Sequence, residues 1–253
     1  MKVKKINTKS IADINKMREG GKKLAKIKEK LALAVKENAN ASDIEGLADS
    51  LISKAGGKPS FKMVSGYHWA TCINVNDGVV HGIPKAEIVF KKGDVVSVDL
   101  GMYYKGFHTD TSFSLGIDLT GKTIAFLDTG RRALKKAIKS ARVGAKVFDI
   151  SREIETEIKK DGYEPIKALV GHGIGKKLHE DPPIPCFVEG ERSDSPDIPE
   201  GAVFAIEVMY TQGSGDVVVG DDGWTITTRD GKISALFEET VALTSNGPII
   251  LTA

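Results

Sequence analysis

Residues 94–112 are DVVSVDLGMYYKGFHTDTS, and this stretch predicts two strands joined by a tight turn. Apolar and polar residues alternate on both sides of residues 104–105, and Gly106 accepts the positive φ of a hairpin. If the turn centres on residues 104–105, Asp99 lies directly opposite Asp110. Carboxylates placed in this way repel each other, so the pairing predicts a cation between them. The alternative is a register one residue off, with both carboxylates in solvent.

The rest of the chain predicts two helices followed by strands, and then the same order again. Ser10 is a candidate N-cap for a helix over 10–37, and a capping box at 42–45 (SDIE) predicts a second helix that ends at 56–57 (GG). The later helices are predicted over 120–141 and 147–160. The strands are predicted at about 71–76, 94–104, 106–115, 201–210, 223–228 and 232–244.

A faint internal repeat accompanies this order of elements. Asp, Ile, Lys, Gly and Pro residues of segment 43–59 recur in segment 149–165 at a constant offset of 106. The repeat and the element order predict an α+β fold of two similar halves that share one core. Since no low-complexity linker interrupts the chain, we treat residues 1–253 as a single domain.

The composition is that of an ordinary soluble globular protein, with 41% hydrophobic and 28% charged residues. No apolar run is long enough to cross a membrane, and two cysteines indicate a reducing cytoplasm. The net charge of +2 is uneven, because residues 1–30 carry +8 and the remainder −6. This basic segment comprises about residues 1–9 and the first helix. It either forms a solvated face or attracts a polyanion such as ribosomal RNA.

Further candidate ligands follow the hairpin. His172 lies in a glycine-rich stretch, 171–175 (GHGIG), and His179 begins a proline-rich one. Glu207 stands among apolar strand residues, as does the pair Glu238 and Glu239, between which alternation does not choose. A carboxylate buried in a strand requires a metal, a cation or a proton. With the two aspartates, these residues suit a pair of Mn(II), Fe(II) or Co(II) ions.

At these residues the chain resembles the type I methionine aminopeptidases over nearly its whole length. The motifs that carry the resemblance are 72–76 (CINVN), 80–84 (VHGIP), 98–99 (VD), 107–112 (FHTDTS), 171–175 (GHGIG), 179–180 (HE), 204–207 (FAIE), 222–225 (DGWT) and 237–238 (FE). The resemblance implies the pita-bread fold, with two pseudo-symmetric α+β halves around a central antiparallel sheet. It also implies removal of the initiator methionine from nascent polypeptides in the cytoplasm, by a monomer without membrane or DNA partners.

The resemblance assigns roles residue by residue. Asp99 would hold one metal ion, His172 and Glu207 the other, and Asp110 and Glu238 would bridge the two. The ions would be manganese, iron or cobalt, with zinc or nickel as alternatives. Glu207 would also move protons. The residues that would meet the substrate are His81, His179, Cys72 and Trp224.

The sequence departs from the family pattern at three positions, where Val208, Leu236 and Glu239 stand instead of Pro, Gln and His. The segment 67–69 (YHW) is also shorter than the family pattern. An X-Pro aminopeptidase or prolidase is the enzymatic alternative, although such enzymes usually carry an additional N-terminal domain. A non-catalytic pita-bread binding protein is the other alternative, although such relatives have lost ligands that this chain retains.

Overall fold

The computed structural model describes residues 6–253. Its helices are α1 (Ile11–Ala34), α2 (Ala41–Lys54), α3 (Gly121–Ser140) and α4 (Val147–Lys160), with short 3-10 turns η1 (Phe61–Met63) and η2 (Arg192–Asp194). Its strands are β1 (Lys58–Pro59), β2 (Thr71–Val75), β3 (Gly78–Val80), β4 (Val95–Tyr104), β5 (Phe107–Gly116), β6 (Glu164–Pro165), β7 (Val170–Gly173), β8 (Glu180–Pro185), β9 (Val203–Thr211), β10 (Val217–Val219), β11 (Ile226–Thr228), β12 (Ser234–Thr244) and β13 (Gly247–Ile250).

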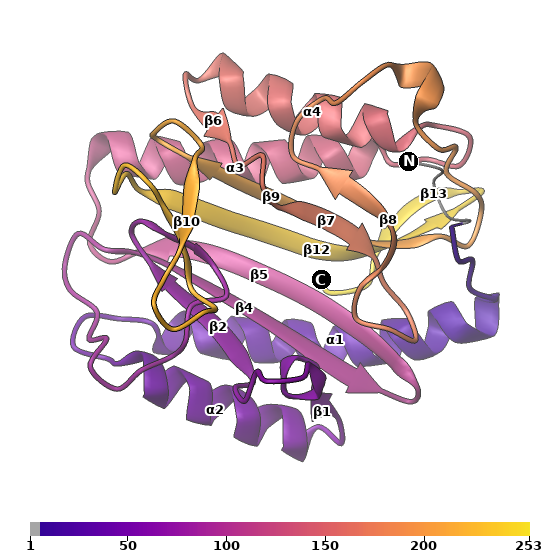
Figure 1. Ribbon diagram of the computed structural model, residues 1–253. Coiled ribbons are helices and arrows are strands. Elements are labelled where there is room, and N and C mark those ends of the chain that lie inside the picture. Colours follow the sequence, from indigo (N-terminus) through magenta and orange to yellow (C-terminus); the bar gives the residue numbers. More distant parts are fainter. Residues whose placement is uncertain (1–5) are drawn as a thin grey trace.

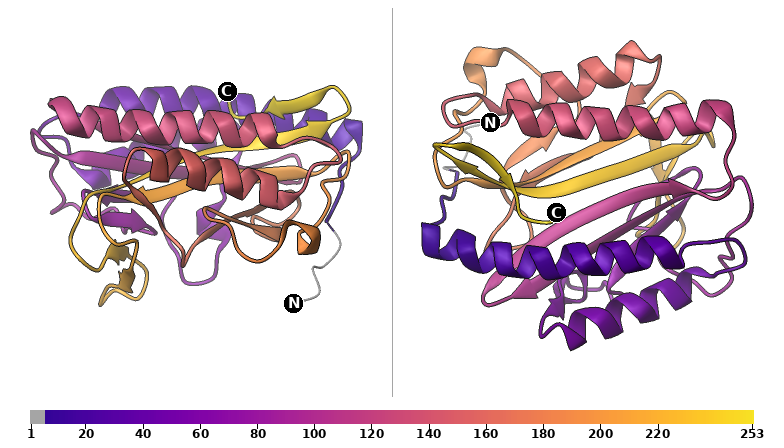
Figure 2. Two further views of the ribbon diagram at one scale, coloured as in Figure 1. Left: turned by 90° about the horizontal axis from the view of Figure 1, so that it is seen from above. Right: turned by 180° about the vertical axis from the view of Figure 1, so that it is seen from behind.

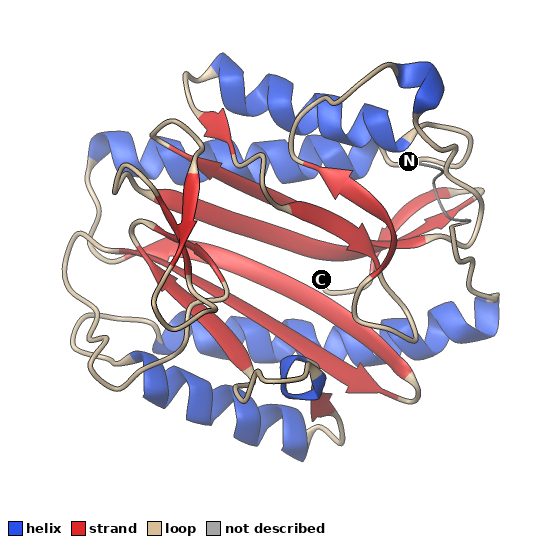
Figure 3. Ribbon diagram, in the orientation of Figure 1, coloured by secondary structure: helices blue, strands red, loops and turns tan. Residues whose placement is uncertain are grey.

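One antiparallel sheet runs through both halves of the molecule (Figure 1). Its main path is β1-β4-β5-β12-β9-β7-β8, and β2, β6 and β13 pair with its members. The strands β10, β11 and β3 form a separate small sheet. The long strands β4, β5, β12 and β9 lie at the centre of the large sheet, so residues from both halves of the chain meet there (Figure 3).

The helices cover one face of this sheet and leave the other to loops and to the small sheet (Figure 2). The α1 helix packs on β4 and β5, and α3 packs on β9 and β12. Side chains alternate between the two faces of a strand, so neighbouring residues of the central strands point either to the helices or away from them. None of the helices in residues 6–253 combines the length and the apolar character that a membrane span requires.

The predicted repeat is confirmed in the structure. The α2 and α4 helices occupy residues 41–54 and 147–160, which are separated by the offset of 106 residues. The same offset relates β1 to β6, the short strands that follow them. The α+β architecture of two similar halves is therefore what local sequence patterns predicted.

The start of the first helix is confirmed and that of the second is corrected. Ser10 caps α1, and its hydroxyl accepts the Asp13 backbone N–H at 3.2 Å. The cap of α2 is Asn40, not Ser42, and its side-chain oxygen accepts the Asp43 N–H at 2.9 Å. Asparagine is as good an N-cap as serine, and it begins the helix two residues earlier.

The central hairpin differs from its predicted register. Its turn residues are Lys105 and Gly106, with φ of 49° and 90°. A turn with two positive φ values favours glycine at the second position, which moves the turn one residue along the chain. Asp99 therefore lies opposite Ser112, and Asp110 lies opposite Gly101. The two carboxylates are diagonal neighbours on one face instead of directly opposed, and the prediction of direct opposition was wrong.

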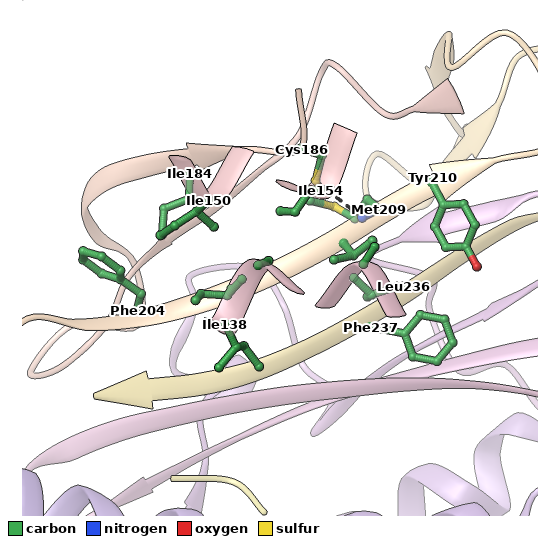
Figure 4. Packing of buried hydrophobic residues seen from close by; sticks show 14 of the residues in the cluster. Ile138, Ile150, Ile154, Ile184, Cys186, Phe204, Met209, Tyr210, Leu236 and Phe237 are labelled. Carbon is green, nitrogen blue, oxygen red and sulfur yellow. Dashed lines mark hydrogen bonds between the residues drawn. The ribbon is translucent and has the colours of Figure 1, made fainter. Parts of the chain in front are cut away.

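The largest apolar cluster lies between the sheet and the helices α3 and α4 (Figure 4). Gly130 of α3 lets the helix approach the sheet closely, because a Cβ there would lie 2.5 Å from the ring of Phe237 and 2.7 Å from that of Tyr210. The Tyr210 hydroxyl in turn accepts the Gly130 N–H at 3.1 Å. Dense packing of this kind fixes the strands that carry the functional residues.

Candidate metal centre and substrate cavity

Four central strands place polar side chains in one row across the sheet. Asp99 on β4 pairs with Ser112 on β5, which pairs with Glu238 on β12, which pairs with Glu207 on β9. Paired residues of an antiparallel sheet share a face, so these side chains gather on one side. That side is opposite the helices, because the next residue, Glu239, reaches Lys28 of α1.

A second row, two residues further along, adds two ligands. Asp110 donates its backbone N–H to Thr240 Oγ1 at 2.8 Å. Thr240 pairs with Ala205, which pairs with His172 on β7. The ligand atoms of Asp110, His172 and Glu238 all lie within 4.8 Å of one another. The structure therefore brings together five predicted ligands from five different strands.

His172 is held in a defined orientation by its glycine neighbours. A Cβ on Gly171 would lie 2.6 Å from the Ala205 carbonyl oxygen, and one on Gly173 would lie 2.3 Å from that of Asp181. The sequence argument that these glycines leave room near the backbone is thus supported by the packing. The His172 Nδ1 donates to the Gly173 carbonyl at 2.9 Å. Its Nε2, 3.5 Å from Glu207 Oε1, is therefore the candidate ligand atom.

The acidic residues of the centre lack partners that would neutralise them. Burial raises the pKa of Asp99 to about 7, and burial and then neighbouring carboxylates raise those of Asp110 and Glu238. Burial also lowers the pKa of His172 to about 3, so this imidazole is neutral. The buried oxygens Asp99 Oδ1 and Glu238 Oε1 have no hydrogen-bond partner in residues 6–253. Orphaned carboxylate oxygens beside a neutral imidazole fit divalent metal ions.

A cavity of about 140 Å³ opens directly onto this cluster. The four predicted substrate residues all line it: Cys72, His81, His179 and Trp224. His172 and His179 also line a second, more open groove of about 890 Å³. The enclosed part has room for one side chain, while the groove can take a longer chain.

The apolar wall of the cavity includes residues that the sequence argument missed, namely Phe61, Val64, Tyr67, Val80 and Leu178. The ring of Tyr67 packs edge-on against Trp224, with centroids 5.1 Å apart, and its hydroxyl donates to the Thr71 carbonyl at 2.9 Å. Tyr67 thus supplies the wall in the shortened segment 67–69, whereas His68 is exposed. An aromatic cluster in one short loop was the available signal.

His81 reaches the cavity through an unusual backbone conformation. Its φ is 57°, a left-handed value that is uncommon outside glycine and often marks a functional position. Burial lowers the pKa of its imidazole, and the nearby His179 lowers it further. His81 is therefore a neutral hydrogen-bonding group at neutral pH.

The three departures from the family pattern leave the ligand atoms in place. Glu239 points to the helix face, where Lys28 Nζ lies 2.6 Å from its Oε1, so Glu238 is the residue that faces the cluster. Val208 is buried on the helix side, paired with Phe237. Leu236 is buried in the apolar core.

Comparisons with known proteins agree with this geometry. The model of metallopeptidase family M24 matches residues 15–245. A methionine aminopeptidase of Clostridium perfringens is 38% identical, over 95% of this chain and 96% of its own length. The crystal structure of a methionine aminopeptidase from Thermotoga maritima superposes with a TM-score of 0.95 at 38% identity, covering 98% of this chain and 99% of the other.

A prolidase from Pyrococcus furiosus shares the fold at a lower level. Its TM-score is 0.77 at 21% identity, and the match covers 97% of this chain but only 65% of the prolidase. The remaining third of the prolidase has no counterpart in the match.

Proposed function

Because the chain belongs to metallopeptidase family M24, among its methionine aminopeptidases, we propose that it removes the initiator methionine from polypeptide N-termini. We expect a preference for substrates whose second residue is small. The observation that carries the proposal is the position of a single-residue cavity lined by all five candidate metal ligands. An enclosed cavity next to the reacting centre supports cleavage after one residue and no further.

Five residues would hold two divalent ions: Asp99, Asp110, His172, Glu207 and Glu238. Bound there, such ions supply an acidified water molecule as the nucleophile. Manganese, iron and cobalt suit this set of oxygen and imidazole ligands, with zinc and nickel as alternatives.

The remaining chemistry falls to side chains of the cavity. The Glu207 carboxylate would accept a proton from the water and pass it to the leaving amine. A His179 ring N–H would stabilise the oxyanion that forms on the scissile carbonyl, at the mouth of the cavity. His81 would hydrogen-bond the substrate, while Cys72 and Trp224 would enclose the methionine side chain. The rest of the polypeptide would leave along the open groove that His179 borders.

The activity is tested with the Mn(II)-loaded enzyme and two tripeptides, Met-Ala-Ser and Ala-Pro-Ser. We expect release of methionine from the first and none of alanine from the second. Release of alanine alone would favour an X-Pro aminopeptidase. No release from either peptide, with both ions bound, would favour a non-catalytic binding protein.

A basic stripe on α1 supports a further proposal about partners. Its members are exposed and spaced four residues apart, and they have no ion-pair partner within residues 6–253: Arg18, Lys22, Lys26 and Lys30. Residues at this spacing lie along one side of a helix. We propose that the stripe attracts ribosomal RNA, which would keep the enzyme near emerging N-termini. The basic residues before position 6 lie outside the described residues.

This proposal is tested by ribosome co-sedimentation at several salt concentrations. Replacing Lys22, Lys26 and Lys30 with Gln should lower the salt slope of binding by about 2 to 3, if each lysine meets one phosphate. The matched control replaces Lys122, Lys135 and Lys139, which are exposed on α3, in the same way. Equal losses in both variants would mean that α1 has no special role.

The same premise extends to compartment and assembly. The two cysteines, Cys72 and Cys186, are both buried and unpaired, which suits a reducing cytoplasm. We propose a single catalytic domain, because one sheet joins the two halves of the chain. We also propose that the enzyme is a monomer. Size-exclusion chromatography with light scattering would measure the mass in solution.

A further inference from the structure

The N-terminal strap, residues 6–9, is built into the fold ahead of α1. Ile6 is buried in the largest apolar cluster, and Thr8 forms a β-bridge with Ala202. The Lys9 backbone N–H donates to the Gly201 carbonyl at 2.7 Å. These contacts fix the position of the Lys9 backbone beside the start of β9.

The Lys9 side chain turns inward to a buried carboxylate. Its Nζ lies 2.9 Å from Glu180 Oε2, and the side chains of Lys9 and Glu180 are only 6% and 5% exposed. The Asn7 amide donates to the same oxygen at 3.3 Å, and the Lys177 N–H donates to Glu180 Oε1 at 3.1 Å. A buried pair with this many hydrogen bonds fixes its surroundings, and loss of one partner leaves a stranded charge.

The Lys9 side chain contacts residues at both ends of the segment 174–180. At one end, a Cβ on Gly175 would lie 2.4 Å from Lys9 Cε, so the glycine leaves room for the lysine stem. At the other end, Glu180 begins β8 and pairs with Gly173. The loop between them carries His179.

His179 depends on this support because its own ring is weakly held. Within residues 6–253 the ring makes no hydrogen bond, and its one aromatic neighbour is His172, edge-on at 4.5 Å between centroids. Its backbone is instead fixed on both sides, by the buried Leu178 and by Glu180. The orientation of a group that donates a hydrogen bond to the oxyanion matters strongly, because a small displacement of this donor reduces the rate of catalysis.

We infer that Lys9 is a positioning residue, which holds His179 in its catalytic orientation through the ion pair with Glu180. The inference rests on the proposed function and extends it to a residue far from the cavity in sequence. It also links the basic N-terminal segment to catalysis, apart from any attraction to RNA.

The test measures kcat and KM on Met-Ala-Ser with the Mn(II)-loaded enzyme. Lys9→Met should lower kcat about 10- to 100-fold with little change in KM, because the lost interaction acts in the transition state. Lys9→Arg, which keeps the ion pair, should retain most of kcat. In a His179→Ala background, Lys9→Met should cause no further loss, since its effect passes through the missing ring.

Two additional variants separate positioning from stability. Lys136→Met breaks an ion pair to the buried Glu157 between α3 and α4, and it should lower Tm without changing kcat. If Lys9→Met folds poorly, Lys9→Met with Glu180→Gln removes both charges and should show the same loss of kcat. Full kcat in the Lys9 variants, or equal losses with and without His179, would overturn the inference. An inactive wild-type enzyme would instead refute the proposed function.

Discussion

Glu207 and Glu238 occupy paired positions on neighbouring strands, with Asp110 close by. Burial is the main reason that the pKa of each glutamate is raised, and the adjacent carboxylates raise it further. A group in this setting takes up a proton or a cation at neutral pH. The raised pKa also suits Glu207 to proton transfer once metal ions bind the neighbouring carboxylates.

Glu207→Gln keeps the shape of the side chain and removes its ability to carry a proton. We expect kcat on Met-Ala-Ser to fall by at least about 10²-fold, the lower end for general acid–base catalysis. The metal content of the variant should be measured alongside, since Glu207 is also a candidate ligand. Near-normal turnover with both ions bound would exclude this role.

Trp224→Ala should widen the cavity on its apolar side. Discrimination between Met and Leu at the first residue should weaken by about 1–3 kcal/mol, as the ratio of kcat/KM values. Trp69→Ala is a matched control, because Trp69 packs on Tyr67 at 5.3 Å but does not line the cavity. An unchanged ratio in the Trp224 variant would remove that residue from the specificity pocket.

At the level of secondary structure, the α2 helix has an N-cap residue, and one of its side chains supports the wall of the cavity. Asn40 caps it, as shown by the bond to the Asp43 N–H. In a capping box at Ser42, the Glu45 side chain would accept the backbone N–H of Ser42. Glu45 instead accepts hydrogen bonds from the backbone N–H groups of Ala70 and Thr71, at 2.6 and 2.9 Å. The helix therefore holds the segment that leads from Tyr67 into β2.

Asn40→Ala should lower the stability of the protein by about 1 kcal/mol, the usual cost of losing an N-cap. For a protein of this size, that corresponds to a fall in Tm of about 2–4 °C. Ser42→Ala should have a smaller effect, because Ser42 lies inside the first turn and its hydroxyl only donates to Asn40 Oδ1. The reverse order of the two Tm values would restore Ser42 as the cap.

In the whole molecule, the sheet gathers four carboxyl groups that repel one another when no cation is bound. In the metal-free protein, the folded-state pKa of Asp99 is raised from 3.8 to about 7. Its contribution to stability is therefore present near pH 4 and is lost as pH rises to about 7. Bound metal depresses these pKa values, so the sign reverses and stability is lost as pH falls.

Thermal midpoints measured with EDTA and with Mn(II) should consequently differ most near neutral pH. The two values should converge toward pH 4 to 5, where protons displace the ions and bound metal adds less stability. Curves that run parallel across this range would contradict the account of a strained carboxylate cluster.

Asp110→Asn separates the two contributions to whole-molecule stability. The variant removes a buried carboxyl group whose ionised form is destabilised by burial and by its neighbours in the metal-free cluster, so its midpoint in EDTA at neutral pH should exceed that of the wild type. It should also abolish most of the rise in Tm caused by Mn(II), because one of the proposed metal ligands is missing. Deletion of an exposed charge, as in Asp118→Asn, should leave the Mn(II) shift intact. An unchanged EDTA midpoint in the Asp110 variant would require another role for that residue.

Local patterns in the sequence were sufficient for the helices, for the internal repeat and for six of the thirteen strands described in residues 6–253, namely β2, β4, β5, β9, β11 and β12. They did not predict the other strands, among them β7, which carries His172. The cap at Ser10 and the coincidence of α2 and α4 at an offset of 106 residues depend on nearby residues. The motifs also named the five candidate ligands, and the structure places all five around one cavity. Patterns of this kind are read within one turn or one strand, where neighbours determine the conformation.

Tertiary structure alone decided what depends on residues far apart. The family resemblance had assigned Glu238, but the physical reason for this choice over Glu239 lies in the fold, where Glu239 points to the opposite face and pairs with Lys28 of α1. The hairpin register and the position of Asp110 opposite Gly101 follow from backbone geometry at the turn. The pairing of Lys9 with Glu180 joins residues 171 positions apart, and no periodicity records such a contact. Packing across the sheet determines these features, because the free energy of a buried charge depends on whatever the fold places beside it.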